Sequence, residues 1–167
     1  LDNFNKDPCA LCAMVNTAEN VAKKFGVTTQ EQHDVKLRRF EQYQDACASD
    51  HAFHKRYMPL PFEIPDPKFR KTVKTMAGDE GIHPTTAEGL SALKPVLPEG
   101  TVTFGAQTHP ADGNAAVILV AGRDRARAMS KTTGVDVPVL SYGQARVKKG
   151  FMPMATVPAA RQALERA

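Results

Sequence analysis

Hydrophobic residues recur at helical spacing in the first third of the chain, and they predict two successive helices. The first is expected over residues 17–25, with Val21 and Phe25 on one face. Asn16 precedes this run and Glu19 follows three residues later, which is the pattern of a capping box. The helix is therefore expected to begin directly after Asn16.

A second helix is expected from Thr29 to about Ser49. Thr28 and Glu31 form another capping-box pair at its start, and Gly26 provides the turn between the two helices. Hydrophobic residues again follow a helical period, with charged and amide residues between them. The residues of this hydrophobic face are Leu37, Phe40, Tyr43 and Cys47.

The pattern becomes extended after the second helix. Residues 57–65 are rich in proline, residues 66–68 (Asp-Pro-Lys) form a turn signal, and residues 69–76 can return as a strand. These features predict a loose hairpin. Its basic residues are Lys68, Arg70, Lys71 and Lys74. They indicate either a solvated edge that deters aggregation, which is the simpler interpretation, or a patch that faces phosphate.

The second half of the chain alternates between helix and strand patterns. Ala115–Ala121 is an uninterrupted apolar run, typical of a strand covered on both faces. The other expected elements are helices over 86–93, 123–131 and 159–167, and strands over 101–104 and within 135–147. This alternation predicts an α/β layer. Because so few strands cannot cover themselves, we expect them to belong to a larger sheet and the chain to be part of a longer protein.

Composition and charge resemble those of ordinary soluble proteins. Of the 167 residues, 42% are hydrophobic and 24% are charged, and no apolar run is long enough to span a bilayer. The net charge of +4 favours anionic partners such as phosphates, nucleotide cofactors or nucleic acid. The basic residues are not interleaved with stacking aromatics and there is no tryptophan, which argues against a nucleic-acid module.

The chain contains three cysteines, Cys9, Cys12 and Cys47. So few cysteines indicate a reducing compartment, because a disulfide framework needs a denser and even set. Cys9 and Cys12 form a CxxC pair, but a structural zinc site needs four ligands and a second pair is absent. The spacing of His33, His51 and His54 matches no familiar zinc pattern. We therefore expect packing cysteines and no metal site.

Five parts of the chain resemble segments of thiolases, in the same order and with similar spacing. They are residues 14–22 (MVNTAENVA), 29–32 (TQEQ), 79–82 with 90–95 (DEGI and LSALKP), 100–103 with 112–116 (GTVT and DGNAA), and 158–167 (PAARQALERA). Together they span almost the whole chain. The sequence thus resembles the middle portion of a thiolase.

The resemblance implies a fold and a division into parts. Thiolases have two similar α/β halves, stacked in five layers (αβαβα), with a loop domain inserted in the first half that covers the active site. By that likeness, residues 1–110 are the loop domain, residues 111–134 the end of the N-terminal half, and residues 135–167 the start of the C-terminal half. A partial α/β thiolase-like fold is expected, in which a helix-rich loop domain is followed by strand, helix, strand and helix.

The resemblance also implies an activity. Thiolases transfer an acyl group between coenzyme A and a carbon nucleophile, by thiolysis or Claisen condensation. One cysteine takes the acyl group as a thioester, while a histidine and a second cysteine move protons. In the family these residues lie upstream and downstream of the part matched here. We therefore expect no catalytic residue in this chain, and a binding role for it.

The resemblance implies five substrate-binding positions. Met14 corresponds to a methionine near the pantetheine channel, and Thr108 to a serine that hydrogen-bonds pantetheine. Phe104 stands where a small residue usually lines the channel, and His83 stands where an arginine usually meets the adenine nucleotide. Met152 corresponds to a methionine on the acyl side. Coenzyme A is implied as a substrate, with no further cofactor and no metal.

Two interpretations of the resemblance remain open. The first is an acyltransferase with an altered substrate, because residues 107–110 (QTHP) replace the family's N-x-S-G. The second is a catalytically silent thiolase-like protein that binds acyl-CoA or lipid. With either one we expect coenzyme A thioesters as partners, neither nucleic acid nor membrane, a homodimer or homotetramer, and a cytoplasmic location.

Overall fold

The structure is a computed structural model, and it describes residues 5–108, 116–130 and 136–167. The backbone divides into two compact units. The α3 unit comprises residues 22–109, and the α6 unit comprises residues 1–21 together with 110–167. The division falls within helix α2 (Met14–Phe25).

Helix α2 begins two residues before the predicted cap. Asn16 lies in its first turn, and the side-chain oxygen of Asn16 accepts a hydrogen bond from the backbone N–H of Ala13 at 3.2 Å. The predicted Asn16–Glu19 capping box is therefore wrong. Asn16 is the third residue of the helix, and its side chain bonds the backbone N–H of Ala13, the residue that precedes the helix. Phe25 ends the helix as predicted, and this residue is 53% exposed.

Helix α3 (Thr29–His51) confirms the second helix and its cap. The Thr28 hydroxyl accepts from the backbone N–H of Glu31 at 3.2 Å, and the Glu31 carboxylate accepts from the backbone N–H of Thr28 at 2.7 Å. The predicted hydrophobic face is half-buried, and the charged residues between its members, such as Arg38 and Glu41, are exposed. The period of the sequence therefore fixed which face of α3 packs.

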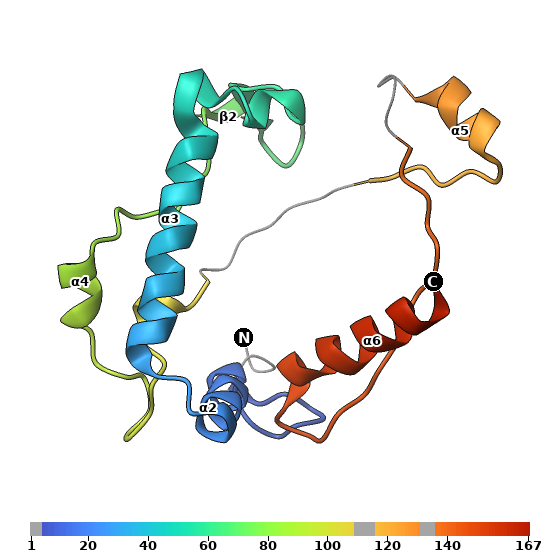
Figure 1. The fold of residues 1–167 in the computed structure, drawn as a ribbon. Helices are drawn as coiled ribbons and strands as arrows, with labels where there is room; N and C mark the ends of the chain where they lie inside the picture. Colours follow the sequence, from blue (N-terminus) through green and yellow to red (C-terminus); the bar gives the residue numbers. More distant parts are fainter. Residues whose placement is uncertain (1–4, 109–115, 131–135) are drawn as a thin grey trace. The chain divides into compact units, whose positions relative to one another are not determined.

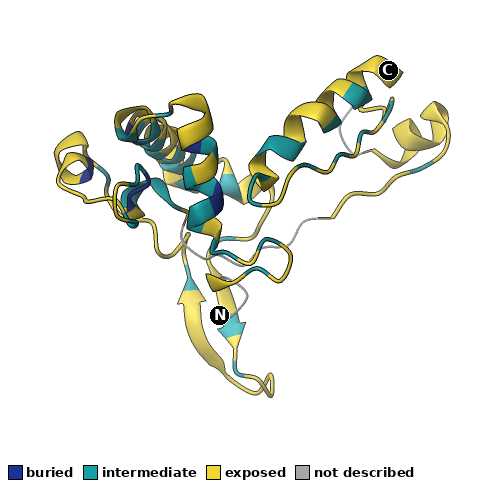
Figure 2. Ribbon diagram, turned by 90° about the horizontal axis from the view of Figure 1, so that it is seen from below, coloured by how far each residue is buried: buried dark blue, intermediate teal, exposed yellow. Residues whose placement is uncertain are grey.

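The core of the α3 unit lies where α3 meets helix α4 (Ala87–Ser91) and the short 3-10 helix η2 (Phe104–Ala106). Figure 1 shows α4 beside the long helix α3. Leu90 and Val102 are buried, at 4% and 6% exposure, as are His33 and Thr103. Figure 2 shows how few residues are buried this deeply. This small core fixes residues 101–106 to α3.

An antiparallel hairpin follows α3 and the 3-10 turn η1 (His54–Arg56). Strand β1 (Phe62–Pro65) pairs with strand β2 (Thr72–Met76), which confirms the predicted hairpin. β2 begins at Thr72 rather than at residue 69, because the Asp66 carboxylate accepts from the backbone N–H groups of Arg70 and Lys71 and holds residues 66–71 in the turn. The basic side chains of the hairpin are exposed, in agreement with a solvated edge.

The other predicted strands are not formed in the described residues. Residues 101–104 make one isolated bridge, between Thr103 and Pro95, and residues 116–121 and 136–147 are in no strand. The side chains of Val117 and Val137 are 84% and 86% exposed. A strand is stabilised by a hydrogen-bonded neighbour and by burial of its side chains, so an apolar run without such a neighbour does not form a strand. The predicted positions of these strands are therefore wrong for this structure.

The α6 unit contains helix α5 (Arg123–Met129), the 3-10 turn η3 (Met152–Ala155) and helix α6 (Thr156–Arg166). α5 and α6 confirm two predicted helices, although α6 begins earlier than expected and holds Pro158 in its first turn. Residues 141–144 run beside α6, where the Ser141 hydroxyl donates to the Ala163 carbonyl at 2.5 Å. None of the described helices combines the length and apolar character needed to cross a bilayer.

Candidate functional site

The predicted binding residues Phe104 and Thr108 follow a segment that is fixed to α3. The Thr29 hydroxyl donates to the Thr101 carbonyl at 2.8 Å. Two residues later the buried Thr103 hydroxyl lies 2.8 Å from Nε2 of His33. Phe104 then begins η2 with 73% of its side chain exposed, and Thr108 is exposed as well. The hydrogen bonds of Thr101 and Thr103 thus fix the backbone to α3 just before the exposed side chains of Phe104 and Thr108.

The backbone of η2 packs closely against two leucine side chains, one in α4 and one just after it. A Cβ atom at Gly105 would lie 2.5 Å from Cδ2 of Leu90 and 2.7 Å from Cδ1 of Leu93, so the two elements are in close contact. Leu90 itself is buried. Glycine at residue 105 is therefore what allows η2 to settle on α4.

His83 lies in the same unit, in the segment between β2 and α4. It is exposed, and its backbone carbonyl accepts a hydrogen bond from the Thr85 hydroxyl at 3.1 Å. The structure therefore places His83 on a different segment from Phe104 and Thr108. All three predicted positions in this unit are open to solvent.

The two predicted methionines belong to segments of the α6 unit. Met14 is the first residue of α2 and is 37% exposed, and Met152 is the first residue of η3 and is 58% exposed. The Asn20 side chain donates to the Gly150 carbonyl at 3.1 Å, and Gly150 has a left-handed φ of +74°. This hydrogen bond ties α2 to the turn that precedes Met152.

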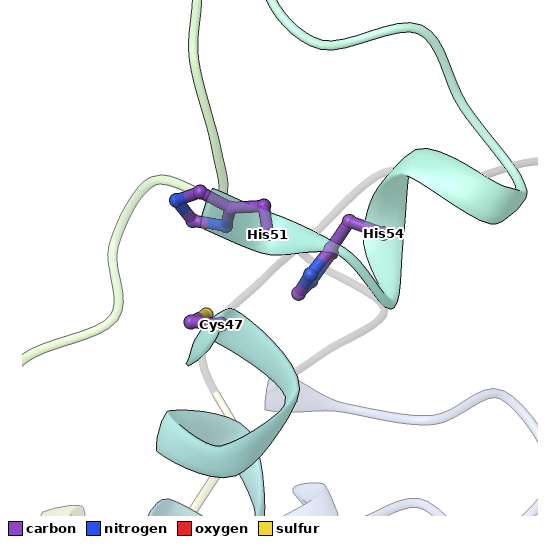
Figure 3. Close-up of side chains that lie close together, drawn as sticks. All are labelled: Cys47, His51 and His54. Carbon is purple, nitrogen blue, oxygen red and sulfur yellow. The ribbon is translucent and has the colours of Figure 1, made fainter. Parts of the chain in front are cut away.

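A separate cluster of one cysteine and two histidines lies at the end of α3, and the sequence analysis did not predict it as a site. One ligand atom from each of Cys47, His51 and His54 falls within 4.8 Å of the other two. Figure 3 shows the three side chains close together, with Cys47 and His51 in the C-terminal part of α3 and His54 in η1. The spacing Cys-x3-His-x2-His was the available signal, but it lies in no known zinc motif.

A reversal of the backbone builds this cluster. The helical geometry of α3 breaks at Ala48, and Ser49, Asp50 and His51 then take left-handed φ values of 54°, 56° and 57°. Non-glycine residues adopt this region rarely, and three in succession are costly. Within this turn, the exposed Asp50 carboxylate forms an ion pair with Lys55 at 2.6 Å.

Polar neighbours surround the cluster. Nε2 of His54 lies 3.2 Å from the Asp79 carboxylate, and the His51 and His54 rings meet edge to face at 5.5 Å. Burial raises the pKa of the Tyr43 hydroxyl, and the adjacent Cys47 thiol and Asp79 carboxylate raise it further. Tyr43 therefore stays protonated and neutral at physiological pH.

A pocket of about 380 Å³ lies in the α6 unit, between residues 142–146 and α6. Its lining residues are Tyr142, Gln144, Ala145, Arg146, Gln162 and Arg166. The Arg166 guanidinium lies 5.2 Å from the centre of the Tyr142 ring and donates to the Tyr142 carbonyl at 2.9 Å. None of the predicted binding residues lines this pocket.

Comparison with known proteins connects the sequence to one family. The family model described as "Thiolase, N-terminal domain" matches residues 6–123. A peroxisomal 3-ketoacyl-CoA thiolase A of Mus musculus is 34% identical over 161 residues, which cover 91% of this chain and 36% of the mouse protein. A peroxisomal 3-ketoacyl-CoA thiolase 2 of Arabidopsis thaliana is 35% identical over 162 residues, covering 92% of this chain and 34% of the plant protein.

A human relative gives the same result. The peroxisomal 3-ketoacyl-CoA thiolase of Homo sapiens is 34% identical over 145 residues, covering 86% of this chain and 32% of the human protein. The chain spans about a third of the length of these curated relatives. The match confirms both the resemblance and the partial α/β thiolase-like fold class. The chain belongs to the thiolase family.

Proposed function

We propose that this chain serves acyl transfer between coenzyme A thioesters, that is, thiolysis or Claisen condensation of 3-ketoacyl-CoA and acetyl-CoA. The observation that carries the proposal is the match to the N-terminal thiolase domain over residues 6–123. Relatives named 3-ketoacyl-CoA thiolases cover most of the chain and agree with it. The enzyme class is acetyl-CoA C-acyltransferase, with fatty acid metabolism as its setting.

The role proposed for this chain is binding. The pantetheine arm of coenzyme A is long and thin, and contacts remote from the thiol set where the thiol lies. An accessible ring at Phe104, which directly follows the anchored Thr103, and an accessible hydroxyl at Thr108 suit contact with such an arm. His83, Met14 and Met152 are the other binding residues in the proposal. No residue of this chain is assigned to the chemical step.

A second candidate is a catalytically silent protein of the same family that binds acyl-CoA or lipid. Phe104 favours it, because this bulky and 73% exposed side chain stands where the family usually has a small one. A ring of this size would re-route the channel beside the pantetheine arm, which changes how the reacting group is placed while the arm can still bind. The two candidates bind the same class of ligand, coenzyme A thioesters, but only the first one catalyses acyl transfer.

Location and assembly stay predictions. The relatives named above are peroxisomal proteins. The low cysteine count of this chain predicts a reducing compartment, and the location we propose is the cytoplasm. All three cysteines are free thiols. A homodimer or homotetramer remains the expected assembly, with coenzyme A as a substrate rather than a resident cofactor and with no nucleic-acid or membrane partner.

Calorimetric titration with coenzyme A, followed by a thiolysis assay with acetoacetyl-CoA, tests the proposal. We expect the 167-residue chain to bind coenzyme A saturably and to show no thiolysis. The full-length protein that carries the chain should thiolyse acetoacetyl-CoA, whereas the silent candidate predicts binding without turnover. A chain that ignores coenzyme A but binds duplex DNA with a steep salt dependence would overturn both candidates.

A further inference from the structure

The cluster of Cys47, His51 and His54 has no part in the binding role proposed above. We propose that it is a site for one divalent transition-metal ion of the Zn²⁺ type, bound by the Cys47 thiolate and the two imidazoles. The sequence had led us to expect no metal site. The inference rests on the geometry of the α3 unit and does not depend on coenzyme A binding.

The donor set and its spacing fit such an ion. Zn²⁺ prefers thiolate sulfur and imidazole nitrogen, with bonds of about 2.3 Å and about 2.0 Å and tetrahedral geometry. Donor atoms in such a site are about 3.3–3.7 Å apart by that geometry. The ligand atoms of Cys47, His51 and His54 are already within 4.8 Å of one another. Small side-chain rotations would close the remaining distance and leave a fourth position open.

The unpaired ring nitrogens point to a ligand. The Nδ1 atoms of His51 and His54 are both buried and have no hydrogen-bond partner in the part of the chain that the structure describes. Buried polar atoms are almost always paired, because an unpaired one keeps the cost of losing its water. A metal ion at the centre of the cluster would be a partner for both atoms.

The second nitrogen of His54 supports the same assignment. Nε2 of His54 lies 3.2 Å from the Asp79 carboxylate, which fixes the ring so that Nδ1 remains for the ion. A carboxylate behind a histidine ligand is the usual arrangement around protein-bound zinc, and it raises the basicity of the ligand. Asp79 is therefore proposed as an outer residue that orients His54.

The charges around the cluster also suit a divalent cation. On binding an ion, the Cys47 thiol would release its proton to solvent, and its sulfur would then add a negative charge to that of the Asp79 carboxylate beside His54. Two lysines of the same unit are paired with carboxylates, Lys55 with Asp50 and Lys74 with Glu80.

The loop before Asp79 is shaped to lie against the cluster. A Cβ atom at Gly78 would lie 3.2 Å from Cε1 and 3.7 Å from Nε2 of His51. Glycine thus lets this backbone approach the ring and brings Asp79 to His54. Ser49, Asp50 and His51 itself have left-handed φ values at the end of α3. Ion binding would help to stabilise this strained turn.

Cobalt substitution tests the site. The purified protein is stripped with a chelator and titrated with Co²⁺ alone, and absorption is recorded. We expect one Co²⁺ per chain, with a near-ultraviolet thiolate-to-cobalt charge-transfer band and the visible bands of a tetrahedral site, both abolished by Zn²⁺. Cys47→Ser should remove the charge-transfer band, and Asp79→Asn should keep it while weakening affinity about 10–100-fold.

The other two cysteines are the matched control. The double variant Cys9→Ser/Cys12→Ser should keep the full spectrum, because neither thiol belongs to the cluster. A band that survives in Cys47→Ser but disappears in this double variant would assign the metal to the CxxC pair and overturn the proposal. Failure of the folded parent protein to bind Co²⁺ in a one-to-one ratio would overturn it too. Far-ultraviolet circular dichroism of Cys47→Ser and of His54→Gln excludes loss of folding as the cause.

Discussion

Nε2 of His33 lies 2.8 Å from Oγ1 of Thr103, and the two residues are only 4% and 0% exposed. This buried hydrogen bond joins helix α3 to a segment 70 positions later in the sequence. The next residue is Phe104, at which the exposed candidate site begins. Stability of the α3 unit and presentation of the site are therefore coupled through one pair.

Thr103→Val should destabilise the α3 unit. The change keeps the shape of the side chain but leaves the His33 ring nitrogen buried without its partner, which costs about 1–3 kcal/mol. Urea unfolding followed by circular dichroism measures the shift in midpoint. Thr75→Val, the same change at an exposed position of β2, should leave the midpoint unchanged. Equal effects of the two variants would contradict a special role for the buried pair.

Gly105→Ala should be destabilising for a steric reason. The new methyl group would meet Leu90 Cδ2 at 2.5 Å and Leu93 Cδ1 at 2.7 Å, and overpacking of this kind costs about 1–3 kcal/mol. Gly26→Ala is the comparison, because it has φ of +67° and no atom within 4 Å of its Cβ position. For Gly26→Ala we expect a loss of stability of about 1 kcal/mol, because alanine is disfavoured in the left-handed backbone conformation. Thermal unfolding of both variants checks the order.

Thr28→Ala should weaken the start of α3. It removes the hydroxyl that accepts from the Glu31 backbone N–H at 3.2 Å, and loss of such a cap costs about 1 kcal/mol. Thr28→Ser keeps the acceptor and should recover most of the stability. Chemical unfolding of the three proteins measures the difference, and a Ser variant as unstable as the Ala variant would contradict the capping account.

Stability should depend on pH through Glu31. The hydrogen bond from the Thr28 backbone lowers the pKa of this carboxyl below its ordinary value of 4.5. A lowered folded-state pKa means that the stabilisation is complete above pH 4.5 and is lost as the pH falls through the lowered value. The melting temperature of Glu31→Gln should lie below that of the parent at neutral pH and converge with it in acid. Glu41→Gln, at an exposed mid-helix position, should show no such convergence.

Thr108→Ala should raise the KM for coenzyme A in the full-length enzyme. Loss of one hydrogen bond worth about 0.5–1.5 kcal/mol corresponds to an increase of about 2–10-fold. Thr108→Ser retains the hydroxyl and should restore the parent value. Steady-state thiolysis kinetics provide the measurement, and unchanged kinetics in Thr108→Ala would remove this residue from the binding site.

The sequence by itself determined the helices, the hairpin and the family. Capping residues, helical periodicity and turn signals act within a few positions, so the second helix and its Thr28–Glu31 cap could be read directly. The same local reading misplaced the first cap, because Asn16 can serve as either the first or the third member of a capping box.

Only the tertiary structure decided what depends on neighbours distant in sequence. The apolar run at residues 116–121 has a strand pattern, but a strand also needs a hydrogen-bonded neighbour, and the period of the run does not supply one. The pairing of His33 with Thr103 and the approach of Asp79 to His54 likewise depend on how the chain returns to α3. Convergence of Cys47, His51 and His54 depends on a left-handed turn at residues 49–51, and although Asp and His adopt this conformation more often than most residues, their presence does not specify it. Local patterns fix local hydrogen bonds and faces, whereas sites form from contacts that the folded backbone brings together.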